Sequence, residues 1–492
     1  MKKIIKKREK LSRKNILIYI LLAIFCLYGI MFLYHSSKPL PKGVSFEGEI
    51  YEVDEDNVEF LYDITYRDEY DNEIIEQKIF DKVLETIDNA EEFIFLDFFL
   101  WDSGEDVHRD LSTELVNHLI EKKKENPEIK INFMTDSYNT FYGSKRHEGF
   151  DKLEENGIEV GFTDLDKLRD SNPIYSAAWR IFFKPFGVPE KCEKSLIKLG
   201  GEKRCIRSAL KALNFKANHR KVLVADNYIN GSKKVVSIVT SANPSSHGSK
   251  YSNVALYIED EIWKDIYYSE KAVADFSKED FVEHDFDIDN VNIEDSATVQ
   301  FLTEGKIKKN FVDEIDKTVE GESIDIAQFL LTERDVVDSL IKASKRGVEV
   351  RLVLDPSYYL FGKDSKGIPN RLAARDLVNE GNGKIDVRWY DTHGEEFHSK
   401  VMVIKKKNGW TIVFLGSANL TRRNIDDYNL EADVKLVAQS DSKVVQDIYA
   451  FFERIYNNEN GHYTLDYEKM EDNSKWKYFK YRFQEATGIS VW

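Results

Sequence analysis

Short apolar runs alternate with amphipathic stretches along most of the chain, and this alternation occurs twice. The apolar run at 93–101 is followed by an amphipathic stretch and then by a second run at 129–136. The run at 323–331 is followed in the same way by an amphipathic stretch and a run at 348–355. Such runs are typical of buried strands and such stretches of helices, so each copy predicts strand, helix and strand. The predicted fold class is α/β in two related halves, each a mixed β-sheet flanked by helices.

One apolar segment is much longer than the others. Asn15–Tyr34 contains no charged residue, and a helix of this length spans about 30 Å, the thickness of a bilayer core. Lysines and arginines dominate the fourteen residues before it, so the positive-inside rule predicts a cytoplasmic N-terminus and an extracytoplasmic body. A cleaved signal peptide is the competing interpretation, although the LYHSSKPLP that follows is a poor cleavage signal. We expect a single-pass anchor in the cell membrane.

The pattern divides the chain into segments. They are a basic cytoplasmic tail at 1–14, a transmembrane helix at 15–34, a linker at 35–56, a first half at 57–270, an acidic connection at 271–297, a second half at 298–460 and a C-terminal tail at 461–492. The tail is rich in aromatic residues and lysines, and either packs as a terminal helix or lies on the membrane.

The first half carries an insert at about 165–210. Asp136 and His219 are 83 positions apart, whereas Asp355 and His398, at corresponding places in the second half, are 43 apart. The insert gathers aromatic residues around 179–186, with a lysine and an arginine among them. These aromatic side chains either pack against the core or enter the headgroup region of a membrane.

Charge and cysteine content narrow the choice of partners. The formal net charge is −17 although the N-terminal tail is basic, and an acidic body repels a nucleic-acid backbone. No nucleic-acid partner is therefore expected, although a local basic groove stays open. Cys192 and Cys205 bracket a short loop in the portion predicted to lie outside, so a disulfide and two free thiols are both open. No Cys/His cluster predicts a metal site.

The most informative feature is a motif that occurs once in each half. His-x-Lys heads an apolar run, a turn and a second run follow, and Ser-Ala-Asn closes the motif. The residues are His219, Lys221, Ser241 and Asn243 in the first half, and His398, Lys400, Ser417 and Asn419 in the second. Because residues two apart on a strand point to the same face, each His and Lys should enter one pocket.

These residue types suit phosphodiester chemistry. A neutral imidazole can attack phosphorus and form a covalent phospho-histidine, and a protonated imidazole can donate to the leaving oxygen. Lysine ammonium and asparagine amide groups, with the two serines, supply donors to the phosphate oxygens. Since Lys221 and Lys400 bring the positive charge, neither a metal ion nor another cofactor is expected.

The motif resembles that of the phospholipase D superfamily, H-x-K-x4-D followed by G-S-x-N. The first copy has the full head, including Asp226, but Thr240 replaces the glycine of the tail. The second copy has the full tail, from Gly416, but Lys405 stands in place of the aspartate. In the family this aspartate mostly supports local structure, so the resemblance implies that both copies keep their phosphate-binding residues.

The resemblance also implies a carboxylate that orients one histidine. The family places it about a dozen residues after the asparagine, where Glu431 stands in the second half and Ala255 in the first. Family order makes His219 the nucleophile and His398 the acid and base. The reverse assignment stays open, because only the second half offers an orienting carboxylate.

The function that the resemblance implies is phosphodiesterase or phosphatidyltransferase activity on phospholipids at a membrane. The similarity is greatest to bacterial cardiolipin synthase-like proteins, which implies cardiolipin synthesis from phosphatidylglycerol. Those proteins commonly carry two membrane segments, whereas one is predicted here. A membrane-tethered nuclease and a non-catalytic lipid-binding protein are the alternatives. The lipid, the acceptor and the oligomeric state are left open.

Overall fold

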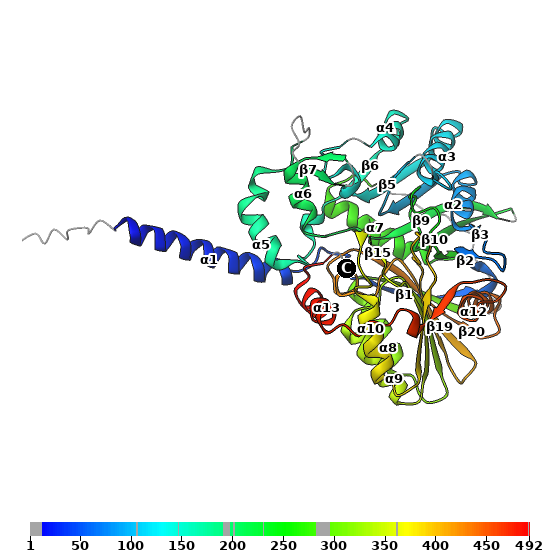
Figure 1. Ribbon diagram of the computed structural model, residues 1–492. Helices are drawn as coiled ribbons and strands as arrows, with labels where there is room; N and C mark the ends of the chain where they lie inside the picture. Colours follow the sequence, from blue (N-terminus) through cyan, green and yellow to red (C-terminus); the bar gives the residue numbers. More distant parts are fainter. Residues whose placement is uncertain are drawn as a thin grey trace, which may run out of the picture.

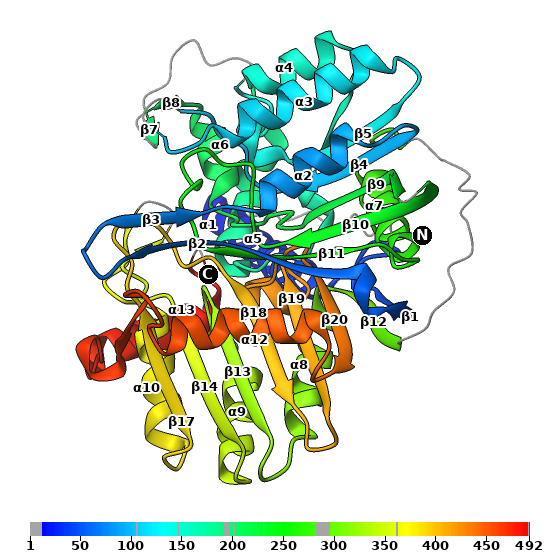
Figure 2. The same ribbon diagram turned by 90° about the vertical axis from the view of Figure 1, so that its right-hand side faces the viewer.

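Two β-sheets stacked face to face form the centre of the molecule, and helices cover their outer faces (Figure 2). The computed structural model describes residues 12–104, 107–145, 147–189, 197–199, 202–229, 231–281, 296–360, 363–490 and 492. Both sheets contribute side chains to one continuous core, with Val224 and Leu256 on one side and Val413 and Val434 on the other. The predicted α/β class with two mixed sheets is confirmed.

The eight-stranded sheet belongs to the first half. Its strands in spatial order are β3 (Glu73–Glu76), β2 (Val58–Arg67), β11 (Asn253–Ile258), β10 (Ser232–Thr240), β9 (Lys221–Ile229), β4 (Phe93–Phe98), β5 (Lys130–Asp136) and β6 (Val160–Thr163). β4, β5 and β6 run parallel, and the other neighbours pair antiparallel.

The nine-stranded sheet repeats this order. Its strands are β1 (Glu47–Asp54), β12 (Ser296–Thr303), β20 (Ala432–Gln439), β19 (Trp410–Gly416), β18 (Lys400–Lys405), β13 (Ser323–Gln328), β14 (Glu349–Leu354), β17 (Ile385–Tyr390) and β21 (Thr464–Asp466). One strand differs from the expected plan: β1, placed by sequence in the linker before the first half, pairs antiparallel with β12 in the second sheet.

Amphipathic helices bury their apolar sides against the sheets. α2 (Ile79–Asp88), α3 (Leu111–Glu125) and α4 (Glu148–Glu155) cover the first sheet, and α8 (Gly305–Asp316), α9 (Arg334–Lys345) and α10 (Asn370–Glu380) cover the second. α7 (Trp263–Ser277) and α12 (Lys443–Tyr456) pack into the core that the sheets share.

The remaining elements are short or peripheral. The insert holds η3 (Leu165–Lys167), α5 (Pro173–Phe182), η4 (Lys184–Phe186), β7 (Ile197–Leu199), β8 (Glu202–Arg204) and α6 (Ile206–Ala212). Elsewhere lie η1 (Glu55–Asn57), η2 (Ser137–Thr140), β15 (Tyr359–Leu360), β16 (Lys363–Asp364), α11 (Arg422–Ile425), η5 (Tyr467–Lys469) and α13 (Lys475–Thr487). Cys205 precedes α6, whereas Cys192 is outside the described residues, so their pairing stays a prediction.

The N-terminal helix α1 (Arg13–Ser37) projects from the body (Figure 1). Its 25 residues, with a window of mean hydropathy 2.8, make it long and apolar enough to cross a membrane. Its C-terminal end is bonded to the body, because Asp170 N donates to His35 O over 2.8 Å and Lys38 Nζ donates to Asp166 O over 2.9 Å. The direction of α1 relative to the body is therefore set by specific contacts.

Candidate active site

The two motif histidines meet where the halves join. His219 lies two residues before the first residue of β9, and His398 lies two residues before the first residue of the equivalent strand β18. Their ring centroids are 6.5 Å apart, and both side chains are almost fully buried. The backbone fixes this approach across the halves, because His219 N donates to Leu430 O and Ser252 N donates to Glu396 O. Two histidines 179 positions apart thus share one site.

A lysine lies beside each histidine in the same arrangement. Lys221 Nζ donates to His219 O over 2.7 Å, and Lys400 Nζ donates to His398 O over 2.8 Å. The ammonium of Lys221 lies 5.3 Å from the ring centre of Phe99, and that of Lys400 lies 5.2 Å from that of Phe329. Sequence reasoning missed both phenylalanines, although each follows directly after an equivalent strand, β4 or β13.

His219 takes its orienting group from the other half. Its Nδ1 lies 3.0 Å from Glu431 Oε2. Ser417 Oγ donates to the same oxygen over 2.5 Å, and Asn424 Nδ2 donates to Oε1. This arrangement leaves Nε2 of His219 as the nitrogen free for chemistry. The sequence singled out Glu431, and the structure shows that it serves the histidine of the first half.

His398, which belongs to the second half, is oriented by Asn253 of the first half. Its Nδ1 lies 3.0 Å from Asn253 Oδ1, which also accepts from Ser241 Oγ over 3.0 Å. The sequence-based comparison placed Ala255 at this position. It did so by counting from Asn243, but the loop between Ser241 and the orienting residue is two positions shorter than its counterpart after Ser417. Asn253, and not Ala255, is therefore the counterpart of Glu431.

The two serines, predicted to bind phosphate, contact the orienting residues. Ser241 and Ser417 are fully buried. Each hydroxyl donates to the orienting residue and accepts from the next backbone N–H, that of Val254 or Ala432. The hydroxyls hold Asn253 and Glu431 in place.

The two motif asparagines close the site. Asn243 Oδ1 accepts from Leu100 N over 3.1 Å, which leaves its amide Nδ2 as a donor for a ligand. Asn419 is buried, and its Oδ1 has no hydrogen-bond partner among the described residues. With the two lysines, these side chains provide donors on both sides of the histidine pair.

Asp226, included among the candidate catalytic residues, lies at the other end of β9. Its carboxylate accepts from the backbone N–H groups of Glu91, Glu92 and Phe93, at 3.1, 3.0 and 2.8 Å, just before β4. This is the structural role that the family resemblance implied. At the corresponding position Lys405 is exposed, with its ammonium 4.9 Å from the centre of the Tyr449 ring, far along β18 from His398.

Asp136 and Asp355 end the equivalent strands β5 and β14. Each caps the turn that follows by accepting from Tyr138 N or Ser357 N over 2.6 Å. The second carboxylate oxygen accepts from the residue that precedes a histidine, Asn218 N at 2.7 Å or Phe397 N at 2.9 Å. Burial raises the pKa of both aspartates to about 7. These carboxylates therefore position the backbone of the two histidines.

Burial also favours uncharged forms inside the site. Together with the charges of Lys221 and Lys400, it lowers the pKa of both histidines well below the usual value. Burial lowers the pKa of Lys221 to about 7 and raises that of Glu431 to about 8. An anion bound between the lysines would favour their protonated forms, so the site is suited to a negatively charged ligand.

Comparison with known proteins extends the resemblance. Residues 311–456, which contain the second motif and Glu431, match the profile of the family described as cardiolipin synthase, PLD-like domain. No curated protein sequence matches the chain significantly. The crystal structure of phosphatidylserine synthase from Haemophilus influenzae Rd KW20 aligns with a TM-score of 0.52 and 12% identity, over 90% of this chain and 94% of that chain.

Two further solved structures align less well. Polyphosphate kinase from Porphyromonas gingivalis has a TM-score of 0.44 and 12% identity, over 80% of this chain and 50% of that one. The phospholipase D family member Nuc from Salmonella typhimurium has a TM-score of 0.27 and 22% identity, over 34% of this chain and 97% of that one. The duplicated motif, the profile match of residues 311–456 and the fold shared with the synthase all agree with the resemblance to the phospholipase D superfamily.

Proposed function

We propose that the protein is a membrane-anchored phosphodiesterase or phosphatidyltransferase that acts on phospholipids through a covalent phospho-histidine. The observation that carries the proposal is the pair of buried imidazoles 6.5 Å apart, each beside a lysine. The match to the cardiolipin synthase family and the long apolar helix α1 support a phospholipid as the substrate class. Synthesis of cardiolipin from phosphatidylglycerol is the specific reaction we propose.

In the first step, Nε2 of His219 attacks phosphorus. The P–N bond forms as the P–O bond to the headgroup alcohol breaks, and protonated His398 donates its proton to the departing oxygen. His219 is assigned as nucleophile because Glu431 at its Nδ1, when ionised, stabilises the positive charge that the imidazole gains. Lys221, Lys400 and the two asparagines donate to the non-bridging oxygens.

In the second step, an acceptor hydroxyl attacks the phospho-histidine. His398 takes the proton of that hydroxyl, a new P–O bond forms, and the P–N bond breaks to restore His219. Water as acceptor gives phosphatidic acid. The terminal glycerol hydroxyl of a second phosphatidylglycerol gives cardiolipin, with free glycerol released in the first step.

Trapping of the covalent intermediate tests this assignment. The full chain is reconstituted in vesicles of phosphatidylglycerol with labelled acyl chains, and the reaction is quenched under denaturing conditions. We expect a labelled protein in the wild type, none in H219A, and retained label with little turnover in H398A. His247→Ala is the matched control, because His247 lies close after the first motif but is 65% exposed.

The outcomes separate the alternatives. Label in H219A that disappears in H398A would reverse the two roles. Headgroup release by the wild type without any trapped label would exclude the covalent route. If plasmid DNA were cleaved and the vesicle lipid left intact, the substrate class would be wrong.

A further inference from the structure

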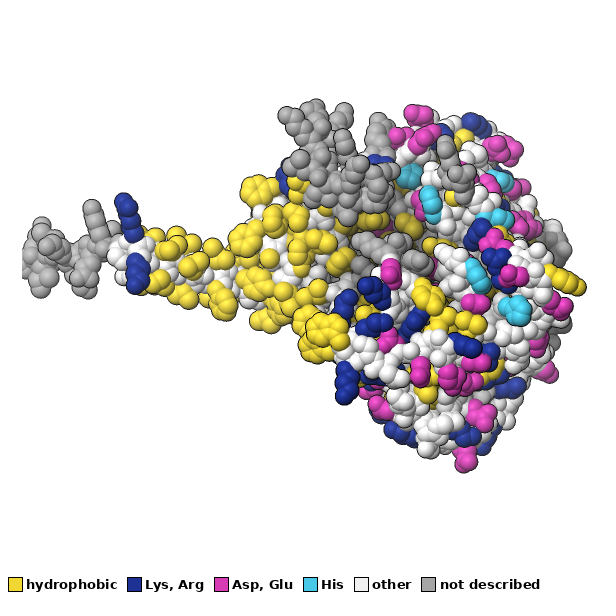
Figure 3. Space-filling model, in the orientation of Figure 1, with side chains coloured by type: hydrophobic (Ala, Val, Ile, Leu, Met, Phe, Trp, Pro, Cys, Tyr) yellow, Lys and Arg dark blue, Asp and Glu magenta, His cyan; other side chains and the backbone are white. Residues whose placement is uncertain are grey.

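An apolar surface outside the catalytic machinery surrounds the base of α1. In Figure 3 hydrophobic side chains continue from α1 over the adjoining face of the body. In the insert, Ile174, Phe182, Phe183 and Phe186 are 42%, 48%, 38% and 70% exposed; on α13, Trp476, Phe479 and Phe483 are 72%, 60% and 48% exposed. We call these seven residues the apolar collar. Of the insert aromatics, Trp179 is buried at 4%, so the insert both packs inward and exposes apolar rings.

The aromatic stripe on α13 is distinct from the face that packs on the body. Trp476, Phe479 and Phe483 follow a helical spacing on one side, with neighbouring ring centroids 5.8 and 6.3 Å apart. The opposite side is anchored by Tyr481, which is fully buried against Trp492 and the start of α10. α13 is therefore held in place by one face and offers a second apolar face outward.

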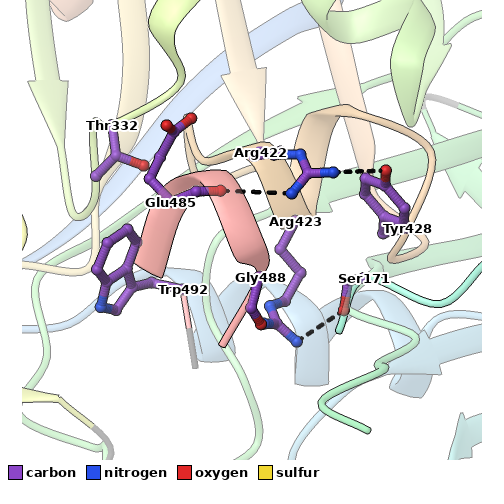
Figure 4. Close-up of a pocket in the computed structure, with 8 residues that line it drawn as sticks. All are labelled: Ser171, Thr332, Arg422, Arg423, Tyr428, Glu485, Gly488 and Trp492. Atoms are coloured by element: carbon purple, nitrogen blue, oxygen red, sulfur yellow. Dashed lines mark hydrogen bonds between the residues drawn. The ribbon is translucent and has the colours of Figure 1, made fainter. Parts of the chain in front are cut away.

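The two helices that carry the collar are in contact at one end. Arg423 donates to Ser171 Oγ over 2.9 Å, just before α5, and to Gly488 O over 3.0 Å, at the end of α13 (Figure 4). Gly488 also lies directly against the backbone of Ser171, where a Cβ would collide with the carbonyl oxygen. The end of α13 and the start of α5 are thus in contact, and the two helices that carry the collar meet beside Ser171.

The contact between α1 and α5 sets the depth of the collar. Tyr28 donates from its hydroxyl to Ile174 O over 2.9 Å. Tyr28 precedes Tyr34, the end of the uncharged stretch, by six residues, which is about 9 Å along a helix. If α1 crosses a bilayer, the start of α5 lies within the same leaflet. A depth of about 5–10 Å is typical of helices that lie in the membrane interface.

We propose that the apolar collar is embedded in the bilayer leaflet from which α1 emerges, so that the body rests on the membrane through three attachments, α1, α5 and α13. The partner is a lipid surface with anionic headgroups, because the exposed Lys475 and Lys480 flank the apolar rings of α13. The proposal rests on α1 spanning a membrane and is independent of the catalytic assignment.

Quenching of tryptophan fluorescence by brominated acyl chains tests the proposal in the full chain. α1 contains no tryptophan, so lipid quenching reports the body. The vesicles contain phosphatidylcholine and phosphatidylglycerol. We expect the fluorescence intensity that brominated lipid quenches to be about twofold lower in W476F than in the wild type, and to fall by a smaller part in W179F. Trp410→Phe is the control, because Trp410 begins β19 at the end away from the site, and its removal should leave the quenching unchanged. Equal quenching in W476F and wild type would overturn the proposal.

A second variant separates the collar from catalysis. In the triple variant W476S/F479S/F483S, α1 and the active-site residues are intact. We expect its turnover of vesicle phosphatidylglycerol to fall about tenfold, while turnover of a dispersed short-chain phosphatidylglycerol is unchanged. Absence of turnover of either lipid by the wild type, with the expected quenching loss in W476F, would count against the proposed function alone. If the stripe instead covered a second copy of the chain, Trp476 would be shielded from brominated lipid and cross-link between chains, which would overturn the membrane proposal.

Discussion

At the scale of single residues, the two histidines differ in what orients them. Asn253 cannot turn its amide, because Nδ2 donates to Tyr251 O over 3.1 Å while Oδ1 accepts from Ser241. His398 therefore faces a neutral oxygen, and His219 faces the carboxyl group of Glu431. A carboxylate stabilises a positive imidazole more than an amide does. This difference favours His219 as the group that carries the phosphoryl bond.

The orienting amide can be tested with Asn253→Asp. A carboxylate beside His398 stabilises its protonated form, so its pKa rises and it stays an acid to higher pH. We expect the basic limb of the kcat/KM profile to move upward by about one pH unit. The measurement is headgroup release across pH in the full chain. An unmoved basic limb would mean that His398 is not the acid of the first step.

Glu431→Gln should shift the acid limb of the kcat/KM profile. Without the carboxylate the protonated form of His219 is less stable, so its already lowered pKa falls further and the acid limb moves to lower pH. We also expect kcat to fall by about 10²- to 10⁴-fold, because an amide can hold the imidazole in the wrong tautomer. A thermal midpoint close to that of the wild type would show that the loss is chemical. A kcat near that of the wild type would contradict the assignment of Glu431.

Anion binding provides a test that needs no substrate. Because burial lowers the pKa of Lys221 to about 7, binding of a sulfate dianion takes up protons and weakens as pH rises through that value. We expect sulfate to raise the thermal midpoint more at about pH 6 than at about pH 8, and the effect to be lost in K221M. A sulfate effect that did not change with pH would contradict the lowered pKa. Lys405→Met, outside the site, should keep the wild-type response.

The sequence was sufficient to predict the motif residues that the structure brings together, but not the groups around them. Histidine, lysine and asparagine carry their chemistry in a short motif. Asn253 carries no such signal. Its position cannot be found by counting a fixed number of residues from the motif, because the loop after Ser241 is shorter than the loop after Ser417. Phe99 and Phe329 also carry no signal in the sequence, because their role depends on the lysine ammonium that lies over each ring in the fold.

At the scale of elements, the two halves hold equivalent strand pairs together by different contacts. The pairs are β9 with β4 in the first half and β18 with β13 in the second. In the first half Asp226 on β9 accepts three backbone N–H groups that lead into β4. In the second half the acid lies before β13 instead, where Glu322 accepts from Lys406 Nζ over 2.7 Å and from Val319 N over 3.1 Å. This exchange explains how Lys405 can replace the motif aspartate without disturbing β18.

The exchange predicts unequal costs for two equivalent substitutions. Asp226→Ala leaves three backbone donors without their acceptor and should lower the free energy of unfolding by about 3 kcal/mol. Lys405→Ala removes an exposed side chain and should change it by less than about 0.5 kcal/mol. Thermal unfolding in detergent compares the two variants. If D226A kept full stability and lost only turnover, Asp226 would have a chemical role.

Strands and helices with strong periodicity were predictable, and elements defined by distant partners were not. The apolar runs became β4, β5, β13 and β14 because buried parallel strands are apolar on both faces. β1 was read as part of a linker, since an edge strand gains its place from backbone pairing with β12, more than 240 residues later. For the tail, composition left two outcomes open, and α13 combines a packed face with an exposed aromatic one.

At the scale of the whole molecule, the halves are joined by a common core and by exchange of parts. β1 belongs to the N-terminal arm but completes the sheet of the second half. The orienting residues cross in both directions, Glu431 to His219 and Asn253 to His398. The site therefore exists only in the assembled chain, although the duplicated pattern could suggest two independent units.

This crossing has a consequence for synthesis. The anchor is complete at Ser37 and the proposed nucleophile at His219, but the carboxyl group that holds its ring belongs to Glu431. A chain synthesised only to its middle has α1 and His219 but neither Glu431 nor His398. The proposed catalytic pair thus comes together only near the end of translation, when the second sheet forms.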